Sequence, residues 1–325
     1  MKKLFKILIV LSIAMSFISC GREVTSWEAK EALSKHLIER YGEEFEIGYM
    51  GRRSDGKEVW YEAEIYPSKY VETVKEYDKY YRESGTVNIE KGILGEKLGK
   101  AGDTYGIVKV NESAEKFYEK KLKELFGDNV LQVYDIWFNR ILDDYSFENI
   151  IRVSDEERTA LIIKGGIYIF GRVESDEDRE WYRKQIYEFI QFMKETGTFE
   201  YVSLGIIIVD DRVLTEQFEN NNKLKQELST NRKLLSDIDF KKKKKELMNQ
   251  ITEKSSSEEI KRKLERINRT NAFNSEGGVY SWSFYNSLLY SHIYSEKYIE
   301  SQKLDHREKL KYDKIEDIKF RTENY

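Results

Sequence analysis

The chain has 325 residues, of which 40% are hydrophobic and 35% are charged, and its formal charge at pH 7 is −4. A mildly acidic chain is a poor match for nucleic acid, so we predict no nucleic-acid partner. The length and the hydrophobic content are sufficient for two domains with cores of their own. A single cysteine excludes a disulfide within the chain, so packing alone must stabilise it.

The first 19 residues have the features of a secretory signal peptide. Lys2, Lys3 and Lys6 supply positive charge, and the apolar segment around them is shorter than the roughly 20 residues that span a bilayer. We therefore predict that residues 1–19 are removed during export. Their removal takes away three lysines and no acidic residue, which changes the formal charge from −4 to −7.

The only cysteine of the chain, Cys20, directly follows this leader in the sequence FISCG. The stretch resembles the lipobox of bacterial lipoproteins, although Phe17 stands where that family usually has leucine and Ile18 is bulkier than usual. The resemblance implies that the Cys20 thiol is acylated and that lipid holds the mature N-terminus at a bacterial membrane, inner or outer. The alternative is an ordinary signal peptide with an incidental cysteine near its end.

Residues 20–110 are predicted to form a first α+β unit. The sequence TSWE at 25–28 has the spacing of a capping box, and apolar residues at every fourth position up to Gly42 predict one helix. Strand-like segments follow at 45–47 and 59–66, with turn residues between them. We expect a helix packed on an antiparallel hairpin.

Two quoted segments of this unit, HLIERYGEEFEIGYM and VWYEAEIYPSKY, carry a second resemblance. Within residues 25–67 they are similar to a segment of small uncharacterised lipoproteins and secreted proteins of low-GC bacteria. In those proteins a helix that ends in YGEEF-like residues is followed by a strand that ends in a YP-like pair. The resemblance implies a helix-on-sheet fold and brings no known activity.

The end of the first unit is predicted to be rich in loops, with residues 85–106 as a loop. Its glycines do not fit a phosphate-binding loop, because three residues rather than four separate Gly95 from Gly99. In addition, Ala101 lacks the hydroxyl group that such a loop places on Mg²⁺. We interpret this stretch as a flexible connector.

Residues 111–214 are predicted to form a second α+β unit. A helix and a strand between 117 and 138 repeat the order helix, glycine, strand, which arises either by duplication or by chance. A helix over 176–195 follows a strand-like segment at 161–173 and precedes another at 201–209. We expect this helix to pack on a sheet that contains both flanking strands.

Residues 215–325 are predicted to be a charged, helical C-terminal region. The lysine run at 241–245 is interpreted as a solvated helix face, with contact to anionic lipid as the alternative. Trp282, Tyr285 and Tyr290 belong to an aromatic-rich stretch. They are candidates for a ligand or partner surface, and the alternative is a core strand and helix.

Few residues have the pattern of a catalytic or metal site, and none is assigned as catalytic. The three histidines lie in different segments, so we predict neither a metal nor another cofactor. His36 stands beside charged residues and is interpreted as a solvated surface residue. Asp210 and Asp211, after the strand predicted at 201–209, are the candidate acidic site, although adjacent acids on a strand point to opposite faces.

These features together predict an α+β protein with two helix-on-antiparallel-sheet units and a helical C-terminal extension. The exported ectodomain, anchored to the cell membrane by lipid, is expected to bind an envelope protein or another envelope component without catalysis. One alternative is a toxin-neutralising immunity lipoprotein whose acidic surface meets a basic partner. Another is a hydrolase with an unrecognised carboxylate site.

Overall fold

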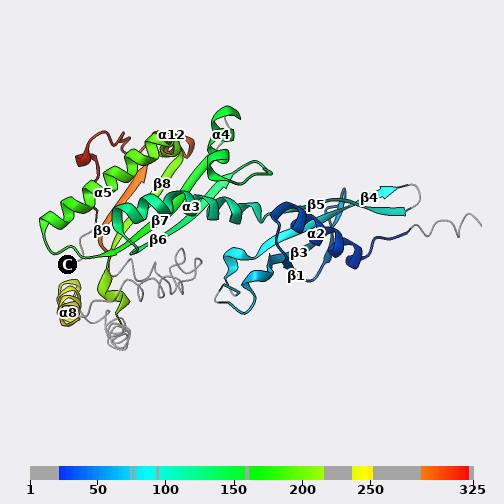
Figure 1. Cartoon of the computed structure of the whole chain (residues 1–325), viewed down its shortest axis with the longest axis horizontal. Coiled ribbons are helices and arrows are strands. Elements are labelled where there is room, and N and C mark those ends of the chain that lie inside the picture. Colours follow the sequence, from blue (N-terminus) through cyan, green and yellow to red (C-terminus); the bar gives the residue numbers. More distant parts are fainter. Residues whose placement is uncertain are drawn as a thin grey trace, which may run out of the picture. The chain divides into compact units, whose positions relative to one another are not determined.

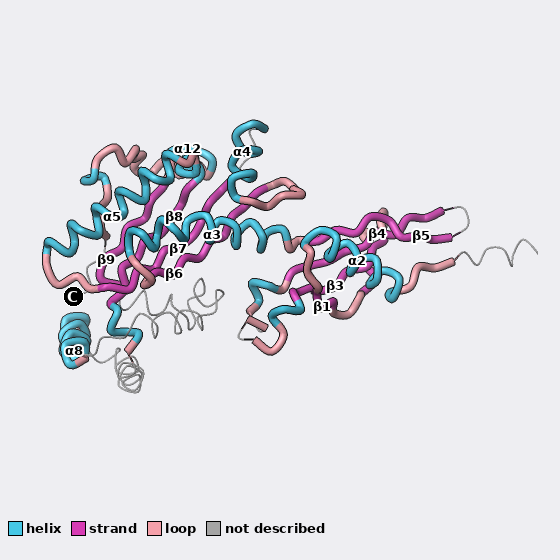
Figure 2. Tube along the Cα trace, viewed as in Figure 1, coloured by secondary structure: helices cyan, strands magenta, loops and turns pink. Residues whose placement is uncertain are grey.

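The computed structural model describes residues 22–73, 75–76, 78–92, 95–157, 161–215, 236–251 and 287–321. The chain divides into two compact units, and the boundary along the sequence falls between Gly106 and Ile107. The predicted α+β class is confirmed, because each unit combines helices with a sheet of its own (Figure 1 and Figure 2).

In the described part of the first unit, helix α2 packs on a five-stranded antiparallel sheet. The strands run in the order β1-β3-β4-β5, and β2 pairs with the same edge of β3 as β1. The elements are α2 (Ser26–Tyr41), β1 (Phe45–Ile47), β2 (Gly51–Ser54), β3 (Val59–Pro67), β4 (Glu83–Gly92) and β5 (Gly95–Asp103).

Helix α2 begins and ends as its sequence predicts. The backbone N–H of Glu28 donates to Thr25 Oγ1 at 3.2 Å, and the Thr25 N–H donates to Glu28 Oε2 at 2.9 Å. These two bonds satisfy donors that the first turn would leave without partners. Gly42 ends the helix with a φ of 66°, which glycine adopts without strain. The buried face consists of Ala29, Leu33 and Leu37.

The loop expected over residues 85–106 is wrong, because β4 and β5 form a paired hairpin there. The glycines of this stretch do not make it a flexible loop; they let neighbouring side chains and strands pack closely. A side chain on Gly85 would lie 2.7 Å from Leu33, and one on Gly99 would lie 3.1 Å from the carbonyl oxygen of Asn88. The end of the first unit is therefore sheet and not the loop-rich segment predicted.

The second unit is built on a four-stranded mixed sheet in the order β6-β7-β8-β9. Strands β7 and β8 are parallel, and the other two pairs are antiparallel. The elements are α3 (Gly106–Phe126), β6 (Val130–Phe138), α4 (Phe147–Glu157), β7 (Leu161–Gly171), α5 (Asp176–Glu195), β8 (Val202–Asp210), α8 (Asp237–Gln250), β9 (Ser287–Tyr294) and α12 (Glu296–Ser301).

Helix α5 connects two strands of the same sheet, as the sequence predicts. It begins with a capping box in which the Asp178 N–H donates to Ser175 Oγ at 3.2 Å. Because β7 and β8 run parallel, the chain needs a crossover to return to the start of the sheet, and α5 supplies it. This crossover explains why the second sheet is mixed rather than wholly antiparallel.

The two faces of the second sheet bury different clusters of apolar side chains. Successive residues of β8 alternate between the faces. Leu204 and Ile206 belong to the larger core with residues of α3 and α5. Ile207 and Val209 belong to a smaller cluster on the other face, which includes Met248 of α8. Strand β8 is therefore buried along its whole length.

The C-terminal region differs from the helical extension that we expected over residues 215–325. Strand β9 pairs with β8 as the fourth strand of the second sheet, and its buried residues Leu289 and Ile293 belong to the larger core. Further along, Tyr312 and Ile318 are buried in the same core. The described part of this region thus completes the second unit. None of the helices in the described ranges has both the length and the apolarity of a membrane span.

Two glycines in adjacent strands of the second sheet give a matched test of packing. A Cβ atom on Gly165 would lie 2.5 Å from the carbonyl oxygen of Val133, whereas one on Gly205 would lie 3.5 Å from the Tyr290 ring. We expect Gly165→Ala to lower the free energy of unfolding by about 1–3 kcal/mol, since the backbone must shift. Gly205→Ala should change it by less than about 0.5 kcal/mol. Urea unfolding of both variants measures these changes. Equal decreases in the free energy of unfolding would contradict the packing described.

Candidate functional site

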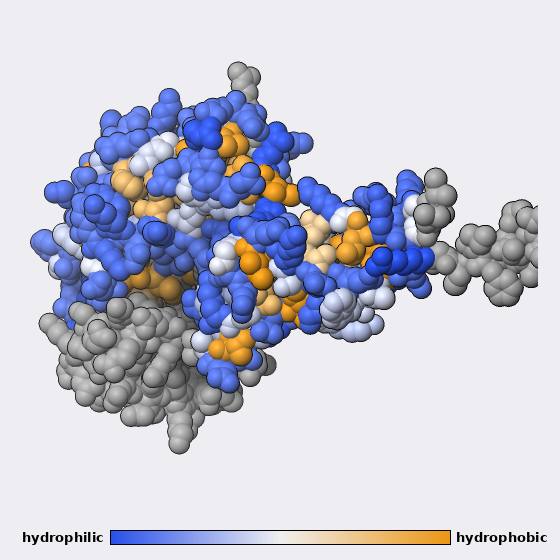
Figure 3. Space-filling model, turned by 45° about the vertical axis from the view of Figure 1, so that its right-hand side comes forward, coloured by the Kyte–Doolittle hydropathy of each residue, from blue (hydrophilic) through white to orange (hydrophobic). Residues whose placement is uncertain are grey.

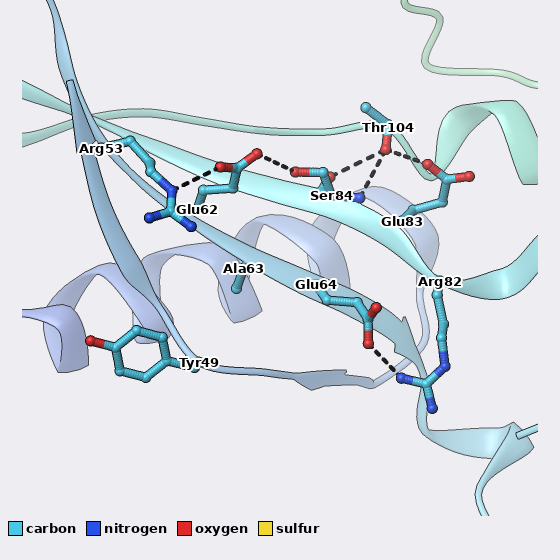
Figure 4. A pocket seen from close by; sticks show the side chains of 9 residues that line it. All are labelled: Tyr49, Arg53, Glu62, Ala63, Glu64, Arg82, Glu83, Ser84 and Thr104. Atoms are coloured by element: carbon cyan, nitrogen blue, oxygen red, sulfur yellow. Dashed lines mark hydrogen bonds and ion pairs between the residues drawn. The ribbon is translucent and has the colours of Figure 1, made fainter. Parts of the chain in front are cut away.

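A polar groove of about 410 Å³ lies on the first unit, on the sheet face that α2 leaves uncovered (Figure 4). Strand alternation accounts for the side chains that β3 contributes. On β3, Glu62 and Glu64 point into the groove, whereas Ala63 between them is buried. The polar and aromatic side chains that line the groove are Tyr49, Arg53, Glu62, Glu64, Arg82, Glu83, Ser84 and Thr104.

A continuous chain of contacts runs along one side of the groove, and Figure 4 shows it as dashed lines. Arg53 Nε donates to Glu62 Oε2 at 3.3 Å, and Ser84 Oγ donates to Glu62 Oε1 at 3.2 Å. The backbone N–H of Ser84 donates to Thr104 Oγ1 at 3.0 Å. The Thr104 hydroxyl in turn donates to the Glu83 carboxylate. The contacts therefore fix the orientation of both carboxylates.

Arg82 is fixed at another part of the groove by three contacts. Its guanidinium pairs with Glu64, and its Nη2 donates to the carbonyl oxygen of Glu76 at 3.1 Å. The same guanidinium lies over the ring of Tyr66, 4.6 Å from its centroid. A planar guanidinium held in this way presents a positive charge at a defined position. The groove thus displays two arginines and three glutamates, so it offers both signs of charge.

Within the groove, the carboxyl group of Glu83 has a pKa above its ordinary value. Burial raises the pKa of its carboxyl group, the hydrogen bond from Thr104 opposes that rise, and the negative charge of Asp103 adds to it. A carboxyl group with a raised pKa binds its proton more readily than an exposed glutamate. Perturbed carboxyl groups of this kind gather at functional sites, although ion-pair networks also produce them.

Behind the groove, Asp103 joins the end of β5 to α2. Its carboxylate is fully buried and lies 2.8 Å from His36 Nε2. It also accepts hydrogen bonds from the Tyr41 hydroxyl at 2.5 Å and from the Tyr105 N–H at 3.0 Å, and Arg40 lies 3.6 Å away. His36 is therefore part of a structural network and not the solvated residue that we expected. This network holds the helix against the edge of the sheet.

The predicted acidic pair does not form one site. Asp210 is buried. Its carboxylate accepts hydrogen bonds from Arg212 Nε at 2.8 Å and from the Arg212 backbone N–H at 3.0 Å. Asp211 instead pairs with Arg172, whose Nε lies 2.8 Å from its Oδ1. Each carboxylate thus has its own arginine. The geometry favours a structural role at the end of β8.

Three of the residues singled out from the sequence, Cys20, Trp282 and Tyr285, lie outside the described residues. Their roles stay predictions. The third aromatic candidate, Tyr290, is described and lies half-buried in β9. Its hydroxyl is 2.7 Å from Nδ1 of His292, and the Nε2 of that ring is 3.1 Å from Ser203 Oγ. Sequence reasoning missed this contact because Ser203 stands in an otherwise apolar strand.

The charge state of His292 argues against catalysis by the Ser203–His292 pair. Burial lowers the pKa of His292 to about 4, and the positive charges of Arg321 and Arg307 act in the same direction. The imidazole is therefore neutral at pH 7 and accepts a proton poorly. A nucleophilic serine needs a base whose imidazolium is stabilised, usually by a carboxylate, whereas here the other ring nitrogen faces a phenol.

Across the residues that the structure describes, no group of three or more histidine, cysteine, aspartate or glutamate side chains is arranged to hold a metal ion.

Comparison with known proteins brings a weak structural likeness. No family model matches the chain, and no curated protein matches it. A solved structure of a DUF5037 family protein from Ruminococcus gnavus ATCC 29149 is similar, with 15% sequence identity and a TM-score of 0.31. The likeness covers 59% of this chain and 78% of that chain. A TM-score at this level supports no conclusion about fold or function.

The lowered pKa of His292 predicts a specific loss of stability in acid. The folded chain binds this proton less readily than the unfolded chain, whose histidine has its ordinary pKa of 6.5. The stability that comes from neutral His292 is thus complete above pH 6.5 and is lost as the pH falls toward 4, by up to about 3 kcal/mol. We expect His292→Gln to remove this part of the pH dependence of the unfolding free energy.

The control for this measurement is His306→Gln, because His306 is exposed. Urea unfolding of the wild type and of both variants is compared between pH 7.5 and 4. The control should keep the wild-type slope. An identical slope in all three proteins would show that His292 is protonated as easily in the folded chain as in the unfolded one.

Proposed function

We propose that the protein is a lipid-anchored lipoprotein of the bacterial cell envelope that binds a partner through the groove of its first unit. The anchoring rests on Cys20, the only cysteine, which directly follows a signal-like leader. The observation that carries the binding role is the groove itself, where Arg53, Glu62 and their neighbours hold charges of both signs in fixed positions.

The chemistry of the groove favours a partner that carries both positive and negative groups, such as a protein surface. Side chains that are already held by neighbours lose less conformational freedom on binding, so more of the contact energy contributes to affinity. Tyr49 stands at the groove with 90% of its surface exposed. Tyrosine side chains of this kind are common where proteins bind one another.

Binding accounts for the described residues better than catalysis does. Asp210 and Asp211, the site that the hydrolase alternative requires, are each engaged by an arginine. The Ser203 hydroxyl contacts His292, whose pKa is lowered by burial and, in addition, by the positive charges of Arg321 and Arg307. The proposed location follows from Cys20: the ectodomain is exported and remains at the membrane that receives the lipid, inner or outer.

Site-specific photocrosslinking in intact envelopes tests this function. A photoreactive phenylalanine replaces Tyr49 in the groove or, as the matched control, Ile141 of the second unit, which is 74% exposed. We expect one discrete crosslinked product from position 49 and none of the same size from position 141. The product should disappear in Cys20→Ala, because that protein no longer remains at the membrane.

Two results would contradict the proposal. The same set of products from both positions would indicate non-specific contact rather than a binding groove. A position-49 product that persists unchanged in Cys20→Ala would separate binding from the lipid anchor.

A further inference from the structure

The outer face of α2 carries two exposed apolar residues on one line. Trp27 is 69% exposed and Ile38 is 46% exposed. They are 11 positions apart, which is close to three helical turns, so they lie on the same side of the helix. A shallow hollow of about 630 Å³ runs between them. Apolar patches interrupt an otherwise hydrophilic surface on the face that Figure 3 shows.

The charges around this hollow balance. Lys30 and Lys35 stand beside Glu31 and Glu39, so the four side chains carry no net formal charge. The Lys30 ammonium donates to the carbonyl oxygen of Ile47 at 2.7 Å, and Lys35 pairs with Glu39 at 3.8 Å. Long-range electrostatic attraction therefore does not determine what binds to this face. Burial of its apolar side chains provides the driving force for binding.

The described chain starts at the same end of α2 as Trp27. The carbonyl oxygen of Arg22 accepts the backbone N–H of Glu96 in β5 at 2.7 Å. The Arg22 guanidinium pairs with Glu28 in the first turn of α2, and the Val24 N–H donates to Glu96 Oε2 at 3.2 Å. These contacts hold the chain against the first unit from Arg22 onward.

Only two residue steps separate Cys20 from Arg22, and an extended chain covers at most about 3.5 Å per step. A lipid on Cys20 would thus keep Arg22, which is paired with the first turn of α2, within about 7 Å of the anchored residue. We propose that the outer face of α2, with Trp27 and Ile38, lies on the membrane that holds the Cys20 lipid. This inference rests on the proposed lipidation of Cys20.

The membrane suits this face better than a soluble partner does. Tryptophan prefers the membrane–water interface, where its ring is apolar and its N–H stays hydrated. A helix that lies in the interface buries its apolar face by about 5–10 Å, which the tether length permits. Because the charged side chains around the hollow balance, zwitterionic lipids without net charge are sufficient. The tether keeps the two surfaces together, so even a modest contact is populated.

Quenching of tryptophan fluorescence by brominated lipid tests this contact. Acylated protein from membranes is reconstituted in phosphatidylcholine vesicles whose acyl chains carry bromine near the headgroup. We expect quenching in the wild type and its loss in Trp27→Phe. In that background, Ile38→Trp should restore it. Tyr49→Trp should not, because Tyr49 lines the groove on the sheet face opposite α2.

The outcomes separate this inference from the proposed function. An N-terminal peptide whose mass shows no acyl group would overturn both. An acylated protein with equal quenching in the wild type and Trp27→Phe would overturn the contact alone, and would assign the face to another partner. Equal quenching in the Tyr49→Trp and Ile38→Trp variants would also overturn it, since α2 would then not be the face on the membrane.

Discussion

The buried carboxylate of Asp103 determines how the first unit is arranged. A negative charge without solvent must be surrounded by donors, and here they come from His36, Tyr41 and the backbone of Tyr105. Two of these three residues lie on α2, so the charge holds the helix against the last strand. The next residue, Thr104, then reaches the groove and orients Glu83. One buried ion thus couples the covered face of the sheet to its open face.

The elements that were predictable from sequence are those with local signals. The capping boxes at Thr25 and Ser175 mark helix starts, and the placement of α5 between β7 and β8 follows from apolar periods of 3.6 and 2 residues. Strand β5 had no such signal, because its glycines lower strand propensity and its pairing with β4 decides its conformation. Strand β9 was hidden in an aromatic stretch whose period was not recognised.

The groove could not be predicted from sequence for a different reason. Arg53, Glu62, Ser84 and Thr104 are separated along the chain, and only the pairing of β2, β3, β4 and β5 brings them together. Each residue alone is typical of a solvated strand face. The separate partners of Asp210 and Asp211 were unpredictable for a related reason, since Asp211 pairs with Arg172 from the end of another strand. Such contacts depend on register, which spacing along the chain does not reveal.

The bond between Arg22 and Glu96 has a consequence for range of action. Many anchored ectodomains act at a distance because a flexible stalk of tens of residues carries them away from the bilayer. With Cys20 acylated, this chain would have no such stalk, since it is bound to β5 two residues later. The first unit could rotate and diffuse laterally, but it could not reach outward. Its partner would have to reside in, or be delivered to, the same membrane.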